Sequence, residues 1–193
     1  MDVDADLVEM LRRGESRGAE QLVERHGDRL YRLAARITGH ADDAEAVVAD
    51  SLRFAAENIG QLRGAASFGA CLARITAKAA YQALTRGRGR KDLVLDDVLP
   101  ALDAEGRHFE PMEDWSRALD ARSGSGRLGE ALADALDALP ADYRTALILR
   151  DMEGWPAEDV AGTLGVSLPV ARTRVHHARL FVRQRLSGVL GVA

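Results

Sequence analysis

The sequence predicts an all-α protein of two small helical domains joined by a long acidic linker. Three observations support this fold class. Apolar residues recur at three- and four-residue spacing through most of the chain, as in amphipathic helices. Aromatic residues make up only 5% of the chain, so its cores must be rich in Leu, Val and Ala, and the charges lie in separate blocks. We expect the first domain at 1–91, the linker at 92–126 and the second domain at 127–193.

The charge blocks indicate where the chain binds its partners. Residues 58–91 carry seven Lys or Arg and no acid, whereas 92–120 carry nine acids against two arginines. Beyond Asp159 there are five arginines and no acid. Two basic blocks separated by an acidic stretch predict two nucleic-acid surfaces and a connector, although the net charge is −4.

The first domain is predicted to contain four helices. Asp42 and Glu45 have the spacing of a capping box, and Ser67 is a suitable N-cap for the last helix. His26 falls on the apolar stripe of the second helix, which favours a core or boundary residue over a ligand. The expected bounds are Asp4–Arg13, Ser16–Ile37, Asp42–Ile59 and a helix that follows Ser67.

Three short periodic runs between Leu139 and Leu186 form the core of the second domain. Pro140 and Pro156 each open a run, since proline is tolerated in a first helical turn. Gly165 stands where a helix C-terminus needs a left-handed residue, and Ser167 suits the N-cap of the next run. Two helices joined by a short turn that contains glycine predict a helix-turn-helix.

The last run combines an apolar face with a cationic face. A helix-turn-helix that presents such a cationic face indicates a DNA reader. Residues near its N-terminus are expected to read bases, and the others to contact phosphates. The predicted apolar face is Ala171, Val175, Ala178, Val182 and Leu186. The predicted base readers are Leu168, Pro169, Arg172, Thr173 and His176, and the phosphate contacts are Arg174, Arg179 and Arg183, with Arg150 as an addition.

Two parts of the chain resemble a known family. The strings LPADYRTALILRDMEG, GVS and ARTRVHHAR resemble region 4 of bacterial RNA polymerase sigma factors, which reads the promoter −35 element. The strings GESRGAEQLVERHGDRLYRLA, DDAEAVVADSL and LRGAASF resemble region 2, which binds polymerase and opens the −10 element. The whole is similar to the compact extracytoplasmic-function (ECF, group 4) type.

The resemblance implies a cytoplasmic promoter-specificity subunit without a cofactor. Its expected partners are bacterial core RNA polymerase, promoter double-stranded DNA and the −10 single strand, with an anti-sigma factor as a further candidate. The polymerase-binding positions would be Asp43, Ala46, Asp50 and Arg53. The −10 positions would be Asn58, Gln61 and Arg63 in a loop, with Arg74, Lys78 and Tyr81 on the helix after it.

The sequence departs from the family at four positions of region 2. Ala49, Leu52, Ala56 and Cys71 stand where Gln, Phe, Trp and Trp are usual. Exposed bases stack on aromatic side chains, at about 1–3 kcal/mol per base. We therefore expect weaker strand opening rather than a different fold.

Other classes of protein are less consistent with the sequence. One cysteine, Cys71, excludes an internal disulfide and argues against a zinc site. No apolar run reaches the ~20 residues of a membrane span. The sequence also shows no nucleophile, metal cluster or phosphate loop that would predict an enzyme. Two alternatives remain: a stand-alone helix-turn-helix regulator, and a sigma-like protein that binds polymerase but initiates poorly.

Overall fold

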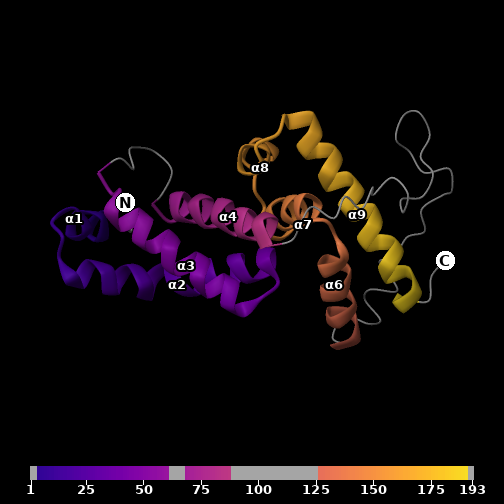
Figure 1. The fold of residues 1–193 in the computed structure, drawn as a ribbon, viewed down its shortest axis with the longest axis horizontal. Coiled ribbons are helices and arrows are strands. Elements are labelled where there is room, and N and C mark those ends of the chain that lie inside the picture. Colours follow the sequence, from indigo (N-terminus) through magenta and orange to yellow (C-terminus); the bar gives the residue numbers. More distant parts are fainter. Residues whose placement is uncertain (1–3, 61–67, 88–125, 191–193) are drawn as a thin grey trace. The chain divides into compact units, whose positions relative to one another are not determined.

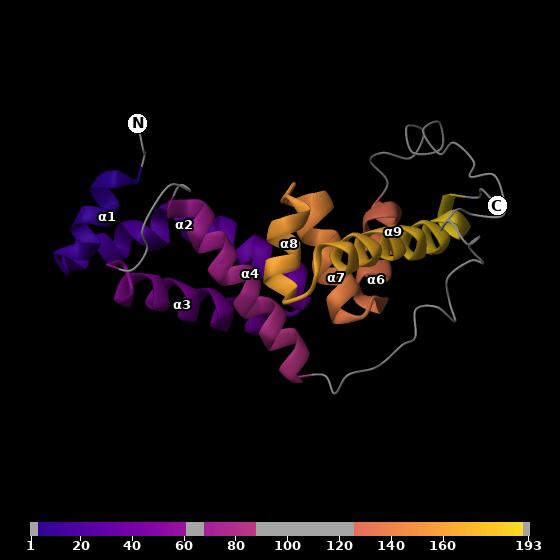
Figure 2. The same ribbon diagram turned by 90° about the horizontal axis from the view of Figure 1, so that it is seen from above.

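A computed structural model describes residues 4–60, 68–87 and 126–190, in which every regular element is a helix (Figures 1 and 2). The helices form two compact units, Met1–Gly89 and Arg90–Ala193. The predicted all-α fold is confirmed. The expected linker, 92–126, lies outside the described residues except for Gly126, which begins the first described helix of the second unit. The bounds proposed for the two domains and the linker therefore stay predictions.

The first unit is a bundle in which three helices contact one another and a fourth, α1, packs on α2. Figure 1 shows α2, α3 and α4 along the unit, with α1 at one end. The helices are α1 (Ala5–Arg12), α2 (Ser16–Thr38), α3 (Ala41–Glu57) and α4 (Phe68–Gly87). Their apolar stripes meet in a core whose most buried side chains include Leu7, Leu22, Leu30, Leu33, Ile37 and Leu72. Each buried leucine contributes about 1.5–3 kcal/mol.

The turn between α2 and α3 corrects one sequence prediction. Gly39 ends α2 in the left-handed region, with φ of 77°, and its N–H donates to the Ala35 carbonyl. His40 is extended and occupies the N-cap position, so α3 already begins at Ala41. The predicted capping box at Asp42 is therefore wrong, because that residue lies inside the first turn and makes no cap hydrogen bond. Its carboxylate instead lies near the positive end of the helix dipole. Ser67, the other predicted cap, lies outside the described residues.

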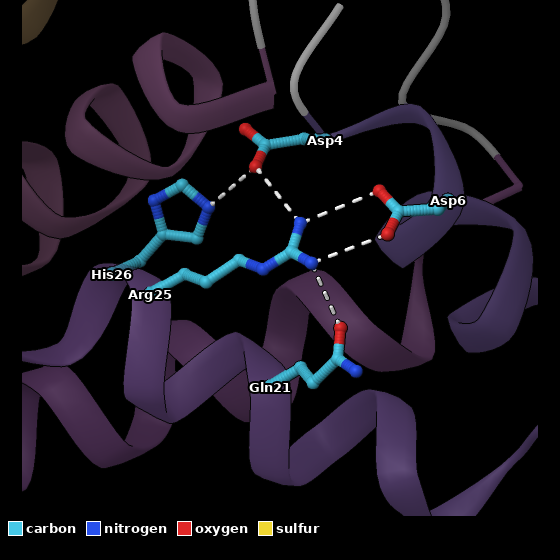
Figure 3. Close-up of polar contacts among 5 residues, drawn as sticks. All are labelled: Asp4, Asp6, Gln21, Arg25 and His26. Carbon is cyan, nitrogen blue, oxygen red and sulfur yellow. Dashed lines mark hydrogen bonds and ion pairs between the residues drawn. The ribbon is translucent and has the colours of Figure 1, made fainter.

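A polar cluster attaches the start of the chain to α2 (Figure 3). The guanidinium of Arg25 donates to both carboxylate oxygens of Asp6, at 3.3 and 3.2 Å, and lies 4.0 Å from Asp4. His26 Nε2 lies 3.3 Å from the Asp4 carboxylate, and its ring meets Phe68 of α4 edge-on. The side chain of His26 is only 12% exposed. The interpretation of His26 as a boundary residue is confirmed.

This cluster predicts an acid-sensitive contribution to stability. Hydrogen bonds from Arg25 hold the pKa of Asp6 below its ordinary value of 3.8, helped by a backbone N–H and opposed by slight desolvation. A carboxyl whose pKa is lower in the folded state stabilises the fold above its unfolded pKa, and loses that effect as the pH falls through the folded value. We expect Asp6→Asn to lower the melting temperature slightly at about pH 7, and to match the wild type at about pH 2.

Thermal melts followed by circular dichroism at the two pH values measure this difference. Glu20→Gln is the matched control, because Glu20 is also an exposed acid of the first unit but is not part of the cluster. An Asp6→Asn deficit of the same size at both pH values would contradict the assignment.

The second unit is organised around its last helix, α9, which contacts α6, α7 and α8. Its elements are α6 (Gly126–Ala138), α7 (Ala141–Leu147), the π-helical turn η2 (Ile148–Met152), α8 (Ala157–Leu164) and α9 (Leu168–Leu190). Figure 2 shows α9 as a long rod beside α6 and α7, with α8 before its start. A cluster of buried side chains joins α6 and α7 to α9: Ala135, Leu136, Leu139, Leu147, Ala178, Phe181 and Val182.

The helix-turn-helix is formed by α8 and α9. Pro156 is the residue before α8 rather than its first residue, and it still leaves no N–H unpaired there. Gly165 ends α8 with φ of 67°, the left-handed conformation that the sequence predicts, and its N–H donates to Ala161. Ser167 directly precedes α9, and its carbonyl accepts the Ala171 N–H at 3.0 Å. The predicted helix-turn-helix is present at the expected residues.

The helix before α8 contains a feature that the sequence pattern does not predict. The run that follows Pro140 is α-helical only to Leu147 and then widens into η2. The Glu153 N–H donates to the Ile148 carbonyl, five residues back. Ile148 is fully buried, whereas Arg150 and Asp151 face solvent. Such single π turns are rare and often lie at functional sites.

Candidate nucleic-acid interface

The residues of α9 that were predicted to read bases lie mostly on its accessible side. The side chains beneath them, Ala171, Val175 and Ala178, are buried against the rest of the unit. The rotation of α9 that the apolar pattern predicts is therefore correct. Leu168 is half-buried, and the exposed members are Pro169, Arg172, Thr173 and His176.

A hollow of about 520 Å³ opens beside this face, and most of the charges around it are positive. Arg172, His176 and Arg179 of α9 line one part of it, and Arg150 of η2 lines another. Arg150 Nη1 donates to the Trp155 carbonyl at 2.7 Å, which fixes its position. The start of α8 also borders the hollow, and the N–H groups of a first helical turn attract anions. The remaining lining residues are Gly154, Pro156, Ala157, Glu158 and Val175. The hollow is suited to an anionic group such as a DNA phosphate.

The cationic face of α9 is partly compensated by acids from other elements. Arg179 donates from Nε and Nη2 to the two carboxylate oxygens of Asp151, at 2.8 and 2.6 Å. Arg174 Nη2 lies 2.8 Å from the Asp142 carboxylate of α7. The cationic face that the sequence predicts is therefore partly neutralised in the folded unit, by acids that are distant in the sequence.

The two ion pairs differ in how open they are. The Arg174 side chain is 20% exposed and Asp142 is 27% exposed, whereas Arg179 is 53% exposed and Asp151 is 33% exposed. Arg174 Nη1 is buried and has no hydrogen-bond partner among the residues that the structure describes. The Arg174 pair thus holds α9 against α7 inside the unit, which makes this arginine a weaker phosphate candidate than Arg179.

Two other predicted −35 residues are less available than the sequence suggests. The Thr173 hydroxyl donates to the Pro169 carbonyl at 3.1 Å, so its methyl group is the more available part for a base. Arg183 is only partly exposed. His177, next to His176, stacks on Tyr143 at a ring-centroid distance of 6.4 Å and belongs to the packing of α9 on α7.

The four predicted polymerase-binding residues share one exposed side of α3. Asp43, Ala46, Asp50 and Arg53 are all exposed, and the Arg53 guanidinium pairs with the Asp50 carboxylate. The structure adds Phe54, which is 50% exposed. The sequence analysis missed it, although an aromatic residue four positions after Asp50 was a usable signal.

The predicted −10 residues are described only in part. Asn58 donates from its side-chain amide to the Phe54 carbonyl at 2.8 Å, which ties it to the end of α3. Gln61 and Arg63 lie outside the described residues. Arg74 and Lys78 are exposed one turn apart on α4, and Tyr81 follows on the same side, partly exposed.

The described part of the chain contains neither a clustered metal site nor a membrane-spanning helix. No group of three or more His, Cys, Asp or Glu side chains there is arranged to hold a metal ion. None of the helices described is both long enough and apolar enough to cross a membrane.

Comparison with known proteins decides the family. Residues 22–90 match the family model of sigma-70 region 2, and 129–182 match that of sigma-70 region 4. An RNA polymerase sigma-H factor of Pseudomonas aeruginosa is 30% identical over 191 residues, 97% of this chain and 95% of the relative. The chain belongs to the sigma factor family.

Other relatives refine the type of this sigma factor. The ECF RNA polymerase sigma factor SigE of Mycolicibacterium smegmatis is 33% identical over 168 residues, which are 87% of this chain but only 61% of SigE. The ECF sigma factor SigM of Mycobacterium tuberculosis is 28% identical over 188 residues, 97% of this chain and 85% of SigM. The resemblance to the ECF type is confirmed.

A solved structure agrees with the fold of this sigma factor. The sigma factor RpoE, from a co-crystal with the anti-sigma factor NepR from Bartonella quintana, matches with a TM-score of 0.59 and 26% identity. The match covers 87% of this chain and 96% of RpoE. CnrH, in complex with the cytosolic domain of CnrY, has the same TM-score at 23% identity and supports the fold alone.

Proposed function

We infer that this sigma factor binds bacterial core RNA polymerase and directs transcription initiation by recognising the −35 and −10 promoter elements. The observation that carries this function is the presence of both sigma regions, 22–90 and 129–182, in one chain. A helix-turn-helix alone could belong to any DNA-binding regulator. A region 2 unit in the same chain favours a protein that works with polymerase.

For the −35 element, we propose that α9 lies in the major groove with its N-terminal half toward the bases. Arg172 is exposed, lines the cationic hollow and has no ion-pair partner among the described side chains. Its guanidinium is free to make two parallel hydrogen bonds to a guanine. Pro169 and the Thr173 methyl supply apolar contacts, and His176 a further polar contact. Arg179, Arg150 and Arg183 are the proposed phosphate contacts. Arg174 is a weaker candidate, because it is paired with Asp142.

For the −10 element, we propose that the segment from Asn58 to Ala66 captures a base turned out of the strand. The polar groups of Asn58, Gln61 and Arg63 would read its edge, while Arg74, Lys78 and Tyr81 of α4 follow the backbone. Turning a base out costs a few kcal/mol. With Leu52, Ala56 and Cys71 in place of the family's aromatic residues, hydrogen bonds must supply more of the selectivity.

For polymerase, we propose that α3 docks through Asp43, Ala46, Asp50 and Arg53, and we add Phe54. Asp50→Arg is expected to weaken association with core enzyme by about 1–3 kcal/mol, because it replaces a paired carboxylate with a charge that also repels Arg53. Titration of labelled sigma factor with core polymerase measures this change. Glu20→Arg, a charge reversal at an exposed site of α2, is the control. Equal affinity of the Asp50→Arg and Glu20→Arg variants would remove this surface from the interface.

We further propose that the protein acts by binding rather than as an enzyme, and that it works in the cytoplasm, where polymerase and promoters are. The relatives named above are sigma factors, which are not enzymes. RpoE of the matched structure binds an anti-sigma factor, so a protein of that kind is a candidate partner of this chain.

One experiment separates this function from a stand-alone regulator. Footprinting on a promoter fragment is done with the protein alone, with core polymerase alone, and with both. A sigma factor protects the −35 and −10 elements only in the combined sample. A stand-alone regulator protects its site without polymerase. A sigma-like protein with poor initiation protects the promoter with polymerase but leaves the −10 strand unreactive to permanganate.

A further inference from the structure

Among the described residues of the second unit, arginines of α7 and α9 pair with carboxylates from other elements. Arg144 pairs with Asp137, Arg174 with Asp142, and Arg179 with Asp151. The Arg144 side chain is only 5% exposed and the Arg174 side chain only 20%, so both guanidinium groups are less accessible to a DNA phosphate than that of Arg179. Arg179 is 53% exposed and lines the cationic hollow. Only the last of these three pairs is placed where DNA can exchange for the carboxylate.

The geometry of this pair resembles that of an arginine–phosphate contact. Both donors point at separate oxygens of one carboxylate, at 2.8 and 2.6 Å, which is the two-pronged arrangement arginine also forms with phosphate. The hydrogen bonds that Arg179 donates to the Asp151 carboxylate raise the pKa of Arg179 above its ordinary value. The guanidinium is therefore charged at any physiological pH, and only anions compete for it.

The acid reaches this position through the π turn. Asp151 lies on η2, next to Arg150, whose side chain is held by the Trp155 carbonyl. The turn is closed by the Glu153 N–H on Ile148 and by the Trp155 N–H on Leu149, at 3.0 and 2.9 Å. The carboxylate is thus presented to α9 by a hydrogen-bonded and partly buried segment, not by a loose side chain on a loop.

We propose that Asp151 is an internal competitor for the DNA backbone, which occupies the Arg179 guanidinium in the free protein and yields it to a phosphate oxygen when α9 enters the groove. The inference rests on the proposed −35 function. Asp151 thereby lowers the affinity of α9 for DNA of any sequence, so that phosphate contacts alone do not keep α9 on the DNA. Asp151 acts through Arg179 and is a positioning residue.

The test measures binding of wild-type and variant holoenzymes to one promoter fragment and to a random-sequence duplex of the same length. An exposed ion pair contributes up to about 1 kcal/mol, so Asp151→Asn is expected to tighten binding to both by about two- to fivefold. Asp151→Glu, which keeps the charge, is expected to stay near the wild type. A pair that serves only to hold η2 to α9 would give weaker or unchanged binding in Asp151→Asn, and would overturn the proposal.

Competition for Arg179 is separated from general repulsion of DNA by testing each variant with Arg179 present and with Arg179→Ala. Glu158→Gln removes one acid from the same hollow, and Glu158 forms no ion pair with Arg179 in the described structure. The gain from Asp151→Asn should exceed the gain from Glu158→Gln when Arg179 is present, and be no larger when Arg179 is alanine. If Asp151→Asn tightens binding equally with Arg179 present and with Arg179→Ala, Asp151 acts only through its charge and the proposal is wrong.

The controls also keep this proposal separate from the proposed function. Circular dichroism melts check that each variant is folded. If wild-type holoenzyme protects no −35 element, the proposed function fails and the inference fails with it. If the wild type protects the element and Asp151→Asn does not tighten binding, only the inference fails.

Discussion

Arg172→Ala is expected to relax base preference at one position of the −35 element and to leave the salt dependence of binding nearly unchanged. A two-pronged arginine–guanine contact discriminates against the wrong base by about 1–3 kcal/mol. Arg172 is exposed near the N-terminus of α9, and no carboxylate among the described residues pairs with it. Selection of −35 sequences from a randomised promoter library by the variant holoenzyme measures the change.

Arg179→Ala is the matched comparison on the same helix. Because Arg179 is assigned to a phosphate, its loss should weaken all sequences alike and lower the slope of log affinity against log salt by about one unit. Part of the loss comes from the Asp151 carboxylate, which then faces the DNA unpaired. If the two variants exchange behaviours, α9 is rotated in the groove. If neither has an effect, α9 is not the reader.

The largest expected effect on stability comes from the core of the first unit. Leu30 is 1% exposed within that bundle, and Leu30→Ala should lower the unfolding free energy of that unit by about 2–5 kcal/mol. Since the two units have separate cores, amide hydrogen exchange should quicken in peptides of α2, α3 and α4 and stay unchanged in those of α6 to α9.

Ile148→Ala is the reciprocal variant. Ile148 is fully buried in the second unit, and its replacement should expose α7, α8 and α9 to exchange while the first unit keeps its protection. Faster exchange throughout the chain in either variant would contradict two independently folded units, and with them the predicted division at the linker.

The helices and the family were predictable from local signals. Gly165 ends a helix as the sequence predicts, because glycine adopts the left-handed conformation at little cost, and Gly39 ends α2 for the same reason. The apolar spacing along α9 correctly predicted its buried face, since only one rotation of the helix places that series of apolar residues against the core. The capping box at Asp42 failed because His40 takes the one extended position after Gly39, and the helix starts earlier than the pattern suggests.

The ion pairing in the candidate site could not be predicted from local signals. Asp151 and Arg179 are 28 residues apart, and their contact depends on how the second unit folds. The π turn that presents Asp151 has no periodic signature, because it inserts a single residue into a short run. The individual promoter and polymerase contacts therefore stay predictions, whereas the fold and the family are established.

In vitro transcription tests the central claim most directly. Purified sigma factor and bacterial core polymerase are mixed with a genomic promoter library, and the run-off transcripts are sequenced. The proposed function predicts transcripts that start at defined sites, each preceded by shared −35 and −10 elements, and their loss when Asp50→Arg replaces the wild type. Transcripts no different from those of core polymerase alone, together with a site that the protein binds without polymerase, would contradict it.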